Sequence, residues 1–488
     1  MRKPHSGGPR EKSATKGRPP SKGGFNKGGF NKARAGGSRD GARSAPPPTA
    51  ATASTDAIGA GAAPRQAALD VLALVRAGAS LDEALADCRR FDALEGADRA
   101  FARALASTVL RRQGALDHVL GDFIDRPLPK RAARAMDALR LAAAQSLLFD
   151  TPDHAAVSTA TALAKAYRET QGYAGLVNAV ARKVARAPKT RLATLPARVD
   201  TPAWLWRSWE RAYGPATARA IAAAHTAAAP TDLTPRDPAA APAFAEAFGG
   251  RVLFGRTVRL DPRTDVKALD GFESGGFWVQ DAAASLPARL LGDVAGKRVF
   301  DLCAAPGGKT MQLAAAGAHV IAVDADGTRL KRVRENLDRT GLDAETVKAD
   351  VRRFAPDAPA DAILLDAPCT ATGTIRRHPD ILRNRTADDV ATLARVQAEL
   401  LDKAWALLKP GGVLVFATCS IQPEEGAAQI DAATARLANA RRVPVTPGEI
   451  DVPEALVSAA GDLRTLPSHL AGDGGIDGFF AARLVKEE

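Results

Sequence analysis

The pattern of apolar and polar positions changes character twice along the 488 residues of the chain. Between residues 63 and 190, apolar side chains recur at helical spacing, as at Ala68, Leu72 and Val75, and prolines stand at the edges of the segments. No convincing alternation of apolar and polar residues interrupts this stretch. We therefore predict an all-helical domain of about five or six helices.

Residues 191–270 carry a mixed pattern. The stretch "TPAWLWRSWERAYG" (201–214) predicts an amphipathic helix with Pro in its first turn, and "PATARAIAAAHTAAA" predicts a second helix directly after it. The stretch "GRVLFGRTVRLD" alternates like a pair of strands. We expect a small α+β module that links the two larger parts of the chain.

From residue 271 to residue 488, short apolar runs alternate with helical segments. The strand candidates lie at 298–306, 319–326, 345–350, 362–368, 412–420 and 478–486. Helical periodicity fills the intervals, for example over Thr328–Thr340 and Asp388–Leu408. Near-continuous apolar strands joined by helices are typical of a parallel sheet covered on both faces. This pattern predicts a doubly wound α/β domain whose ligands bind at the carboxyl ends of its strands.

The first 62 residues differ from all of these segments. Gly, Lys, Arg, Ser and Pro dominate, aliphatic side chains are nearly absent, and "GGFNK" occurs twice in tandem. Such a segment cannot offset its ordering entropy by burial, so we expect it to be disordered. Residues 1–45 contain twelve Lys or Arg against Glu11 and Asp40, a net of +10 within a chain total of +12. The tail can contact RNA nonspecifically through charge and Phe stacking, or serve solubility alone.

The small number of cysteines and the lack of long apolar runs indicate the cellular compartment. We expect neither a signal peptide nor a membrane span, and we expect a cytoplasmic protein. The four cysteines, Cys88, Cys303, Cys369 and Cys419, are too few for a disulfide framework in so long a chain. Cys88 lies away from every motif and is interpreted as structural. The other three stand where a buried strand meets a loop.

The motif "DLCAAPGGKT" (301–310) ends the first strand of the α/β part and opens a helix. Gly307 and Gly308 allow a tight turn and close approach to a ligand. The spacing matches neither the phosphate-binding P-loop nor the GxGxxG dinucleotide pattern. Asp324 and Asp350 end the next two strands, where carboxylates can accept from ribose hydroxyls and from an adenine edge. We predict a nucleoside pocket, although each Asp by itself could simply cap a helix or finish a strand.

A second motif, "DAILLDAPCTATGTIRRHPDI" (361–381), places Asp366 and Cys369 after an apolar strand and over the same crevice. Its two arginines, Arg376 and Arg377, can bind a phosphate backbone or lie in a solvated loop, and both interpretations remain open.

The third motif, "ATCSIQPEEG" (417–426), puts Cys419 at the end of the fifth strand. Pro423 is expected to begin a helix with Glu424 and Glu425 in its first turn. A helix start nearby would favour a thiolate at Cys419, although a small buried residue at a strand end is the other interpretation.

These three motifs together resemble the signature motifs of RNA cytosine-5 methyltransferases that use S-adenosylmethionine. The helical segment, which ends "GLVNAVARKVAR", resembles the NusB-like domain of one bacterial branch, the Sun/Fmu-type (RsmB) 16S rRNA methyltransferases. The stretches "FWVQDAAASLPARLL" (277–291) and "DGFF" (477–480) also match that branch. The resemblance implies four parts: a disordered basic tail (1–62), an all-α NusB-like RNA-binding domain (63–190), a small α+β linking module (191–270) and a Rossmann-like S-adenosylmethionine-dependent methyltransferase domain (271–488).

The resemblance also implies roles for individual residues. A thiolate that adds at C6 of cytosine makes C5 able to attack a methyl group. Cys419 is implied to be this nucleophile, Cys369 to assist product release, and Asp366 to hold the N3/N4 edge of the base, while Lys309 is implied to touch the active site. A DNA-type enzyme would attack with the cysteine of the "PC" motif, and the presence of both motifs argues against that assignment. The implied cofactor-binding residues are Cys303, Ala304, Ala305, Pro306, Gly307, Gly308, Lys309, Asp324, Asp350 and Asp366.

The resemblance implies methylation of C5 of a cytosine in 16S rRNA, either as naked RNA or in an early-assembly small subunit. We expect a monomer without metal. A tRNA cytosine-5 methyltransferase is the alternative among enzymes. A non-catalytic RNA-binding assembly or antitermination factor is the alternative outside them, because of the helical domain and the basic tail. One departure stands out: "TDLTPRDPA" (231–239) lacks the Asn of the Arg-x-Asn pattern that relatives carry in the linking module.

Overall fold

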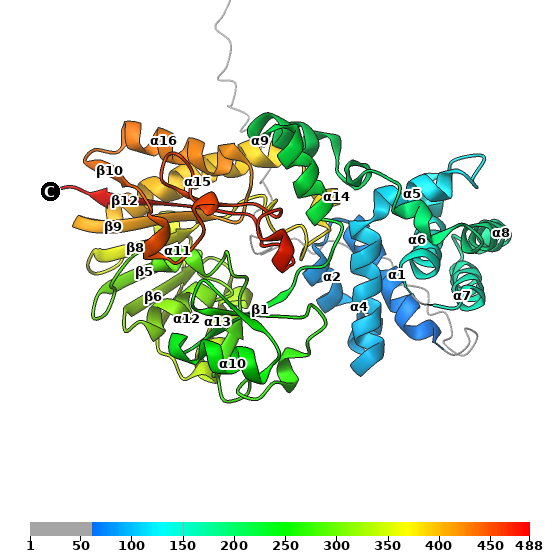
Figure 1. Cartoon of the computed structure of the whole chain (residues 1–488), viewed down its shortest axis with the longest axis horizontal. Coiled ribbons are helices and arrows are strands. Elements are labelled where there is room, and N and C mark those ends of the chain that lie inside the picture. The colour runs from blue at the N-terminus through cyan, green and yellow to red at the C-terminus, as the bar shows by residue number, and fades with distance from the viewer. Residues whose placement is uncertain (1–60, 150) are drawn as a thin grey trace, which may run out of the picture. The chain divides into compact units, whose positions relative to one another are not determined.

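The computed structural model describes residues 61–149 and 151–488 (Figure 1). The predicted basic tail therefore lies, up to residue 60, outside the described residues. In this part of the chain no helix is long and apolar enough to cross a membrane.

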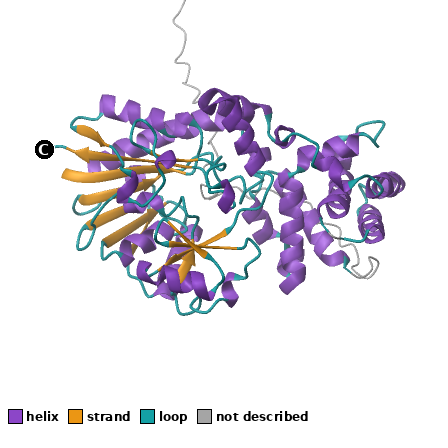
Figure 2. Ribbon diagram, in the orientation of Figure 1, coloured by secondary structure: helices purple, strands orange, loops and turns teal. Residues whose placement is uncertain are grey.

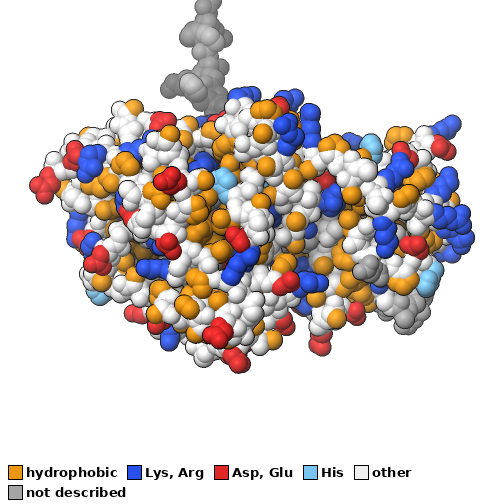
Figure 3. Space-filling view, viewed as in Figure 1, with side chains coloured by type: hydrophobic (Ala, Val, Ile, Leu, Met, Phe, Trp, Pro, Cys, Tyr) orange, Lys and Arg blue, Asp and Glu red, His pale blue; other side chains and the backbone are white. Residues whose placement is uncertain are grey.

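The segment predicted to be all-helical is helical, as expected. Six of its helices have nine residues or more: α1 (Ala62–Arg76), α4 (Gly96–Arg111), α5 (Gln113–Gly121), α6 (Ala133–Leu148), α7 (Asp153–Ala166) and α8 (Ala174–Ala185). Two are shorter, α2 (Leu81–Asp87) and α3 (Arg89–Asp92). They share one apolar core, which includes Cys88. Lys and Arg side chains gather over α8 in Figure 3, where Arg182 and Lys183 are exposed in its last turn.

The linking segment contains one kinked helix and a small sheet. The two predicted helices are joined as α9 (Ala203–Ala224), with a break at Gly214, whose φ is 81°, followed by Pro215. The expected strand pair is present as β2 (Arg251–Leu253) and β3 (Thr257–Leu260). These strands belong to an antiparallel sheet of order β2-β3-β1-β4, with β1 (Thr231–Pro235) and β4 (Phe277–Val279), and α10 (Ala241–Ala247) precedes β2. The sheet thus extends beyond residue 270.

The C-terminal part is a doubly wound α/β domain, as predicted. Its strands are β5 (Arg298–Leu302), β6 (His319–Asp324), β7 (Glu345–Lys348), β8 (Ala360–Asp366), β9 (Leu408–Thr418), β10 (Ala440–Val443), β11 (Leu463–Thr465) and β12 (Phe479–Lys486). The sheet order is β10-β12-β9-β8-β5-β6-β7, and β11 pairs with β12. The strands from β7 across to β9 are parallel, whereas β12 runs antiparallel to β9.

Helices cover both faces of this sheet, as Figures 1 and 2 show. One face carries α11 (Leu286–Arg289), α12 (Gly308–Ala315) and α13 (Gly327–Thr340), and the other carries α15 (Ala387–Leu407) and α16 (Ala427–Arg436); α14 (Ile381–Asn384) lies in the loop after β8. Successive residues of β5 point to opposite faces, so Val299 packs with the α11 side and Phe300 with the α15 side. The order of the strands reverses at β5: β6 and β7 follow on one side of it, and β8 and β9 lie on the other. Such a switch point opens a crevice at the carboxyl ends of the strands.

Candidate active site

The loop after β5 is shaped by backbone conformations that few residues adopt. Gly307 has a φ of 102°, and a Cβ atom built on it would lie 3.1 Å from Cγ1 of Val333. Cys303, the first residue of the loop, also has a positive φ, of 63°. At Gly308 a Cβ atom would lie 3.2 Å from the side-chain nitrogen of Gln280. Glycine at these two positions therefore allows the loop to pack closely against Val333 and Gln280 at the switch point of the sheet.

Asp324, at the end of β6, is buried and holds this loop in place. One carboxylate oxygen accepts the N–H of Ala305 at 3.1 Å, and the other accepts the N–H of Asp326 at 2.9 Å. Asp326 in turn caps α13 by accepting two backbone N–H groups. Each carboxylate oxygen has a second lone pair, so Asp324 can still accept from ribose hydroxyls.

Asp350 follows β7 and is only partly buried. Its carboxylate binds the guanidinium of Arg352, with an Nη2–Oδ2 distance of 2.6 Å, and accepts the N–H of the same residue. The hydrogen bond from Arg352 lowers the pKa of Asp350 below its usual value. A ligand that reached Asp350 would therefore meet an ionised carboxylate already shared with one arginine.

The two cysteines of the second and third motifs lie side by side. The Sγ atoms of Cys369 and Cys419 are 3.5 Å apart, and both residues are partly exposed. The hydrogen bond to Cys419 raises the pKa of Cys369 well above its usual value, and burial and the charges of Cys419 and Glu425 act in the same direction. One thiol of the pair thus keeps its proton while the other can act as the acceptor.

Lys309 connects the loop after β5 to the cysteines. Its Nζ atom donates to Oδ2 of Asp366 at 2.7 Å and lies 4.9 Å from the ring centre of Phe479. Burial alone would lower the pKa of Lys309, but the carboxylate of Asp366, with Asp301 and Cys419, raises it. A cation is therefore held against the carboxylate of Asp366, at the end of β8.

Two neighbours of Lys309, Asp301 and Phe479, were not among the predicted site residues. Asp301, inside β5, is fully buried, and burial raises its pKa to about 7. A carboxylate within an otherwise apolar strand was a usable signal in the sequence. Phe479 lies under Lys309 and belongs to the quoted "DGFF", but its position depends on β12 inserting beside β9, which local pattern does not reveal.

The structure contradicts both interpretations of the two arginines after Cys369. Arg376 is buried and donates to Asp477, and Arg377 donates to Asp477 at 2.8 Å and to Asp281 at 2.6 Å. These guanidinium groups are bound internally, so neither is a solvated loop residue or a free phosphate contact. The expectation failed because Asp477, which binds both, lies about one hundred residues away in the chain.

The predicted helix start after Cys419 is confirmed: Pro423 is its first residue, and Glu424 and Glu425 lie in its first turn. This element is a single 3-10 turn, Pro423–Glu425, and the α-helix α16 begins at Ala427.

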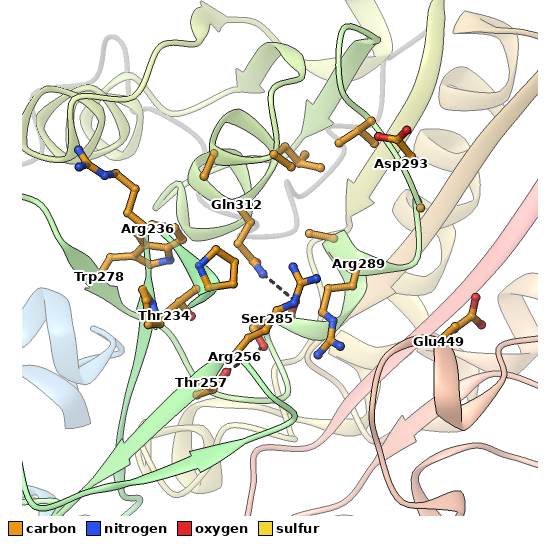
Figure 4. Close-up of a pocket in the computed structure, with 18 residues that line it drawn as sticks. Thr234, Arg236, Arg256, Thr257, Trp278, Ser285, Arg289, Asp293, Gln312 and Glu449 are labelled. Carbon is orange, nitrogen blue, oxygen red and sulfur yellow. Dashed lines mark hydrogen bonds between the residues drawn. The ribbon is translucent and has the colours of Figure 1, made fainter. Parts of the chain in front are cut away.

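A cavity of about 390 Å³ lies apart from the cysteines and the loop after β5 (Figure 4). None of the predicted site residues lines it; its polar lining includes Thr234, Arg236, Arg256, Arg289 and Gln312. Within the described ranges, no group of three or more His, Cys, Asp or Glu residues could hold a metal ion.

Comparison with protein families gives two matches in this chain. The model of the 16S rRNA methyltransferase RsmB/F family matches residues 288–485, and the NusB family matches residues 62–186. Both matched segments correspond to parts described above, the α/β domain and the helical segment.

Individual proteins resemble the chain over most of its length. It is 38% identical over 444 residues to ribosomal RNA small subunit methyltransferase B of Pseudomonas syringae pv. tomato, covering 87% of this chain and 97% of that protein. The enzyme of the same name from Escherichia coli O157:H7 is 36% identical over 415 residues, covering 80% of this chain and 91% of that protein.

Solved structures share the fold. The crystal structure of PH0851 superposes with a TM-score of 0.69 at 22% identity, covering 87% of this chain and 99% of that one. The structure of NSun6 from Pyrococcus horikoshii with SFG gives a TM-score of 0.50 at 20% identity, covering 59% and 98%.

Proposed function

Because this chain belongs to the RsmB/F family of 16S rRNA methyltransferases, we propose that it transfers a methyl group from S-adenosylmethionine to C5 of a cytosine in 16S rRNA. The observation that carries this proposal is the pair of thiols 3.5 Å apart, beside a buried lysine and at the switch point of the sheet. C5 of cytosine is a poor nucleophile by itself, so a thiol that activates the ring is the chemistry required.

Cys419 is proposed to attack. Its sulfur forms a bond to C6 of the cytosine, and C5 becomes an enamine carbon that can take up a methyl group. Asp366 accepts a hydrogen bond from the N4 amino group of the base, and from N3 once N3 carries a proton in the adduct, which stabilises the adduct. Its partial exposure leaves one side of the carboxylate available for this contact.

Cys369 is proposed to assist product release. After methylation the C5 proton passes to water, its electron pair restores the C5–C6 double bond, and the bond between C6 and Sγ of Cys419 breaks with its electrons on the sulfur. The 3.5 Å contact between the two sulfurs supports this division, because the Cys369 thiol can donate a hydrogen bond to the departing sulfur.

The residues at the switch point are chemically suited to S-adenosylmethionine, which supplies the methyl group when bound. The tight turn at Gly307 and Gly308 lies at the switch point of the sheet, and Asp324 and Asp350 offer carboxylates at two strand ends. We propose that the loop Cys303–Lys309 and the acidic residues Asp324, Asp350 and Asp366 hold this molecule.

The cytosine must be unstacked before Cys419 can reach it, so the substrate is proposed to be a loop or an unfolded stretch of rRNA, naked or in an early-assembly small subunit. Transfer of tritium from labelled S-adenosylmethionine to rRNA tests the activity and excludes a purely RNA-binding factor. Bisulfite sequencing of rRNA and tRNA from a deletion strain tests the substrate class. Loss of a tRNA signal with intact rRNA methylation would replace 16S rRNA by tRNA in the proposal.

The roles of the cysteines are tested by trapping. The variant Cys369→Ala should accumulate a covalent protein–RNA adduct that survives denaturation on a gel, while Cys419→Ala should methylate nothing and form no adduct. Cys88→Ala is the matched control, because Cys88 is buried in the helical core. An adduct formed by Cys419→Ala, but not by Cys369→Ala, would exchange the two roles.

A further inference from the structure

A carboxylate outside the predicted site connects the two loops that carry the cysteines. Glu425 is fully buried, in the turn before α16. Its Oε1 atom accepts the backbone N–H of Thr370 at 2.9 Å, and its Oε2 atom accepts the hydroxyl of Ser420 at 2.6 Å and also that of Thr370. Thr370 directly follows Cys369, and Ser420 directly follows Cys419. One side chain thus fixes the residue next to each thiol.

Gln397, on α15, completes this arrangement. Its side-chain nitrogen donates to Oε1 of Glu425 at 3.2 Å and to the carbonyl of Pro368 at 2.9 Å, so it holds the same loop from the other flank. The backbone carbonyl of Glu425 also accepts the hydroxyl of Thr418 at 2.9 Å. Four donors reach the Glu425 carboxylate, and a carboxylate is an acceptor at every lone pair, so the site suits Glu better than Gln.

Hydrogen bonds, and no cation among the described residues, hold the carboxylate of Glu425. Among the ion pairs of the described residues, none includes Glu425, and burial raises its pKa. A buried carboxylate without a cation destabilises a fold unless hydrogen bonds offset the lost hydration. Its charge instead acts on Cys369, where it disfavours a thiolate, while Lys309 acts on Cys419.

We propose that Glu425 is a positioning residue that fixes the two thiols relative to each other and places a buried carboxylate behind the loop of Cys369. This inference rests on the proposed roles of the two cysteines. The charged or titratable groups that bear on the pair come from several elements: Lys309 at the start of α12, Asp366 at the end of β8, Asp301 in β5, Glu425 before α16, and the cysteines themselves.

The test compares Glu425→Gln, which removes the charge at nearly constant shape, with Glu424→Gln, which alters the exposed neighbouring residue. Alkylation of each cysteine by iodoacetamide is followed by mass spectrometry of the full chain between pH 6 and pH 10. Loss of a nearby like charge lowers a pKa by about one unit or more, so Cys369 should be alkylated about tenfold faster in Glu425→Gln. Glu424→Gln should match the wild type, and equal Cys369 rates in all three proteins would overturn the proposal.

Methylation kinetics separate positioning from charge. Glu425→Asp keeps the charge but withdraws the carboxylate, so kcat should fall at least tenfold while KM for RNA and the alkylation rate of Cys369 stay close to wild type. Ser420→Ala, a milder change, removes one link to the Cys419 loop and should lower kcat in the same sense. Unchanged kcat in both variants would overturn the positioning role. A wild type that methylates no RNA would refute the proposed function instead, because alkylation requires no substrate.

Discussion

Asp301 provides a quantitative test of the electrostatics beneath the site. Its Oδ2 atom accepts the hydroxyl of Thr310 at 2.6 Å, whereas Oδ1 is buried and has no hydrogen-bond partner among the described residues. Burial raises the pKa of Asp301 from 3.8 to about 7, although the bond from Thr310 and the charge of Lys309 both lower it. Asn has almost the same shape and does not titrate. We predict that Asp301→Asn removes one pH-dependent component of the stability of this sheet.

The sign follows from proton binding in the two states. The folded chain holds the Asp301 proton up to about pH 7, whereas the unfolded chain releases it near pH 3.8. This stabilisation is fully present below pH 3.8 and is lost as the pH rises to 7, because the unfolded state then binds fewer protons. Each pH unit is worth about 1.4 kcal/mol for one proton, so the total loss is at most about 4 kcal/mol.

Hydrogen–deuterium exchange of the peptide 298–310 in the full chain measures this effect, because opening of β5 exposes Asp301. After correction for intrinsic exchange, the protection of wild type relative to Asp301→Asn should fall by up to about tenfold per pH unit between pH 5 and pH 7, then level off. Asp343→Asn, at an exposed position, should track the wild type. A ratio of wild type to Asp301→Asn that stays constant from pH 5 to pH 8 would refute the reasoning.

Two further substitutions test the loop and the internal arginines. Gly307→Ala should weaken S-adenosylmethionine binding at least tenfold by calorimetry, because a side chain at a φ of 102° is strained and meets Val333, whereas Gly292→Ala, also at positive φ but in open space, should not. Arg377→Met should lower the free energy of unfolding by about 3 kcal/mol, since it leaves the buried carboxylate of Asp281 without its cation, yet leave the salt dependence of RNA binding unchanged. If RNA binding by Arg377→Met depended less steeply on salt concentration than binding by the wild type, Arg377 would contact phosphate after all.

The architecture was predictable wherever apolar pattern alone determines an element. Buried parallel strands are apolar on both faces, so each predicted strand has a counterpart in the sheet. Strand ends were less accurate, since β5 stops at Leu302 while the apolar run continues through the loop to Pro306. β9 begins earlier than expected, at Leu408, and includes Pro410 and Gly411, which lie before the predicted strand at 412–420.

The contacts within the site were predictable only where both contacting residues belong to the same motif. Cys303 to Gly308 form one continuous loop, so local sequence was sufficient to identify a tight turn at a strand end. Contacts between distant segments were not accessible in this way. The bond from Lys309 to Asp366 spans 57 residues and that from Thr370 to Glu425 spans 55, and neither is implied by spacing. Glu425 was therefore assigned to the first turn of a helix rather than to the cysteine loops.

Strand order explains why two thiols meet at all. In the ladder between β8 and β9, Asp366 is the register partner of Ala417, so Cys369 and Cys419 follow the same point of two adjacent parallel strands. Such strands lie about 4.8 Å apart, which brings the two loops onto one edge of the sheet. Two thiols in contact cannot both ionise without strong repulsion, so the pair carries at most one negative charge. The hydrogen bond to Cys419 raises the pKa of Cys369, and the buried carboxylate of Glu425 acts in the same direction, so the two thiols that the strand order brings together are not equivalent.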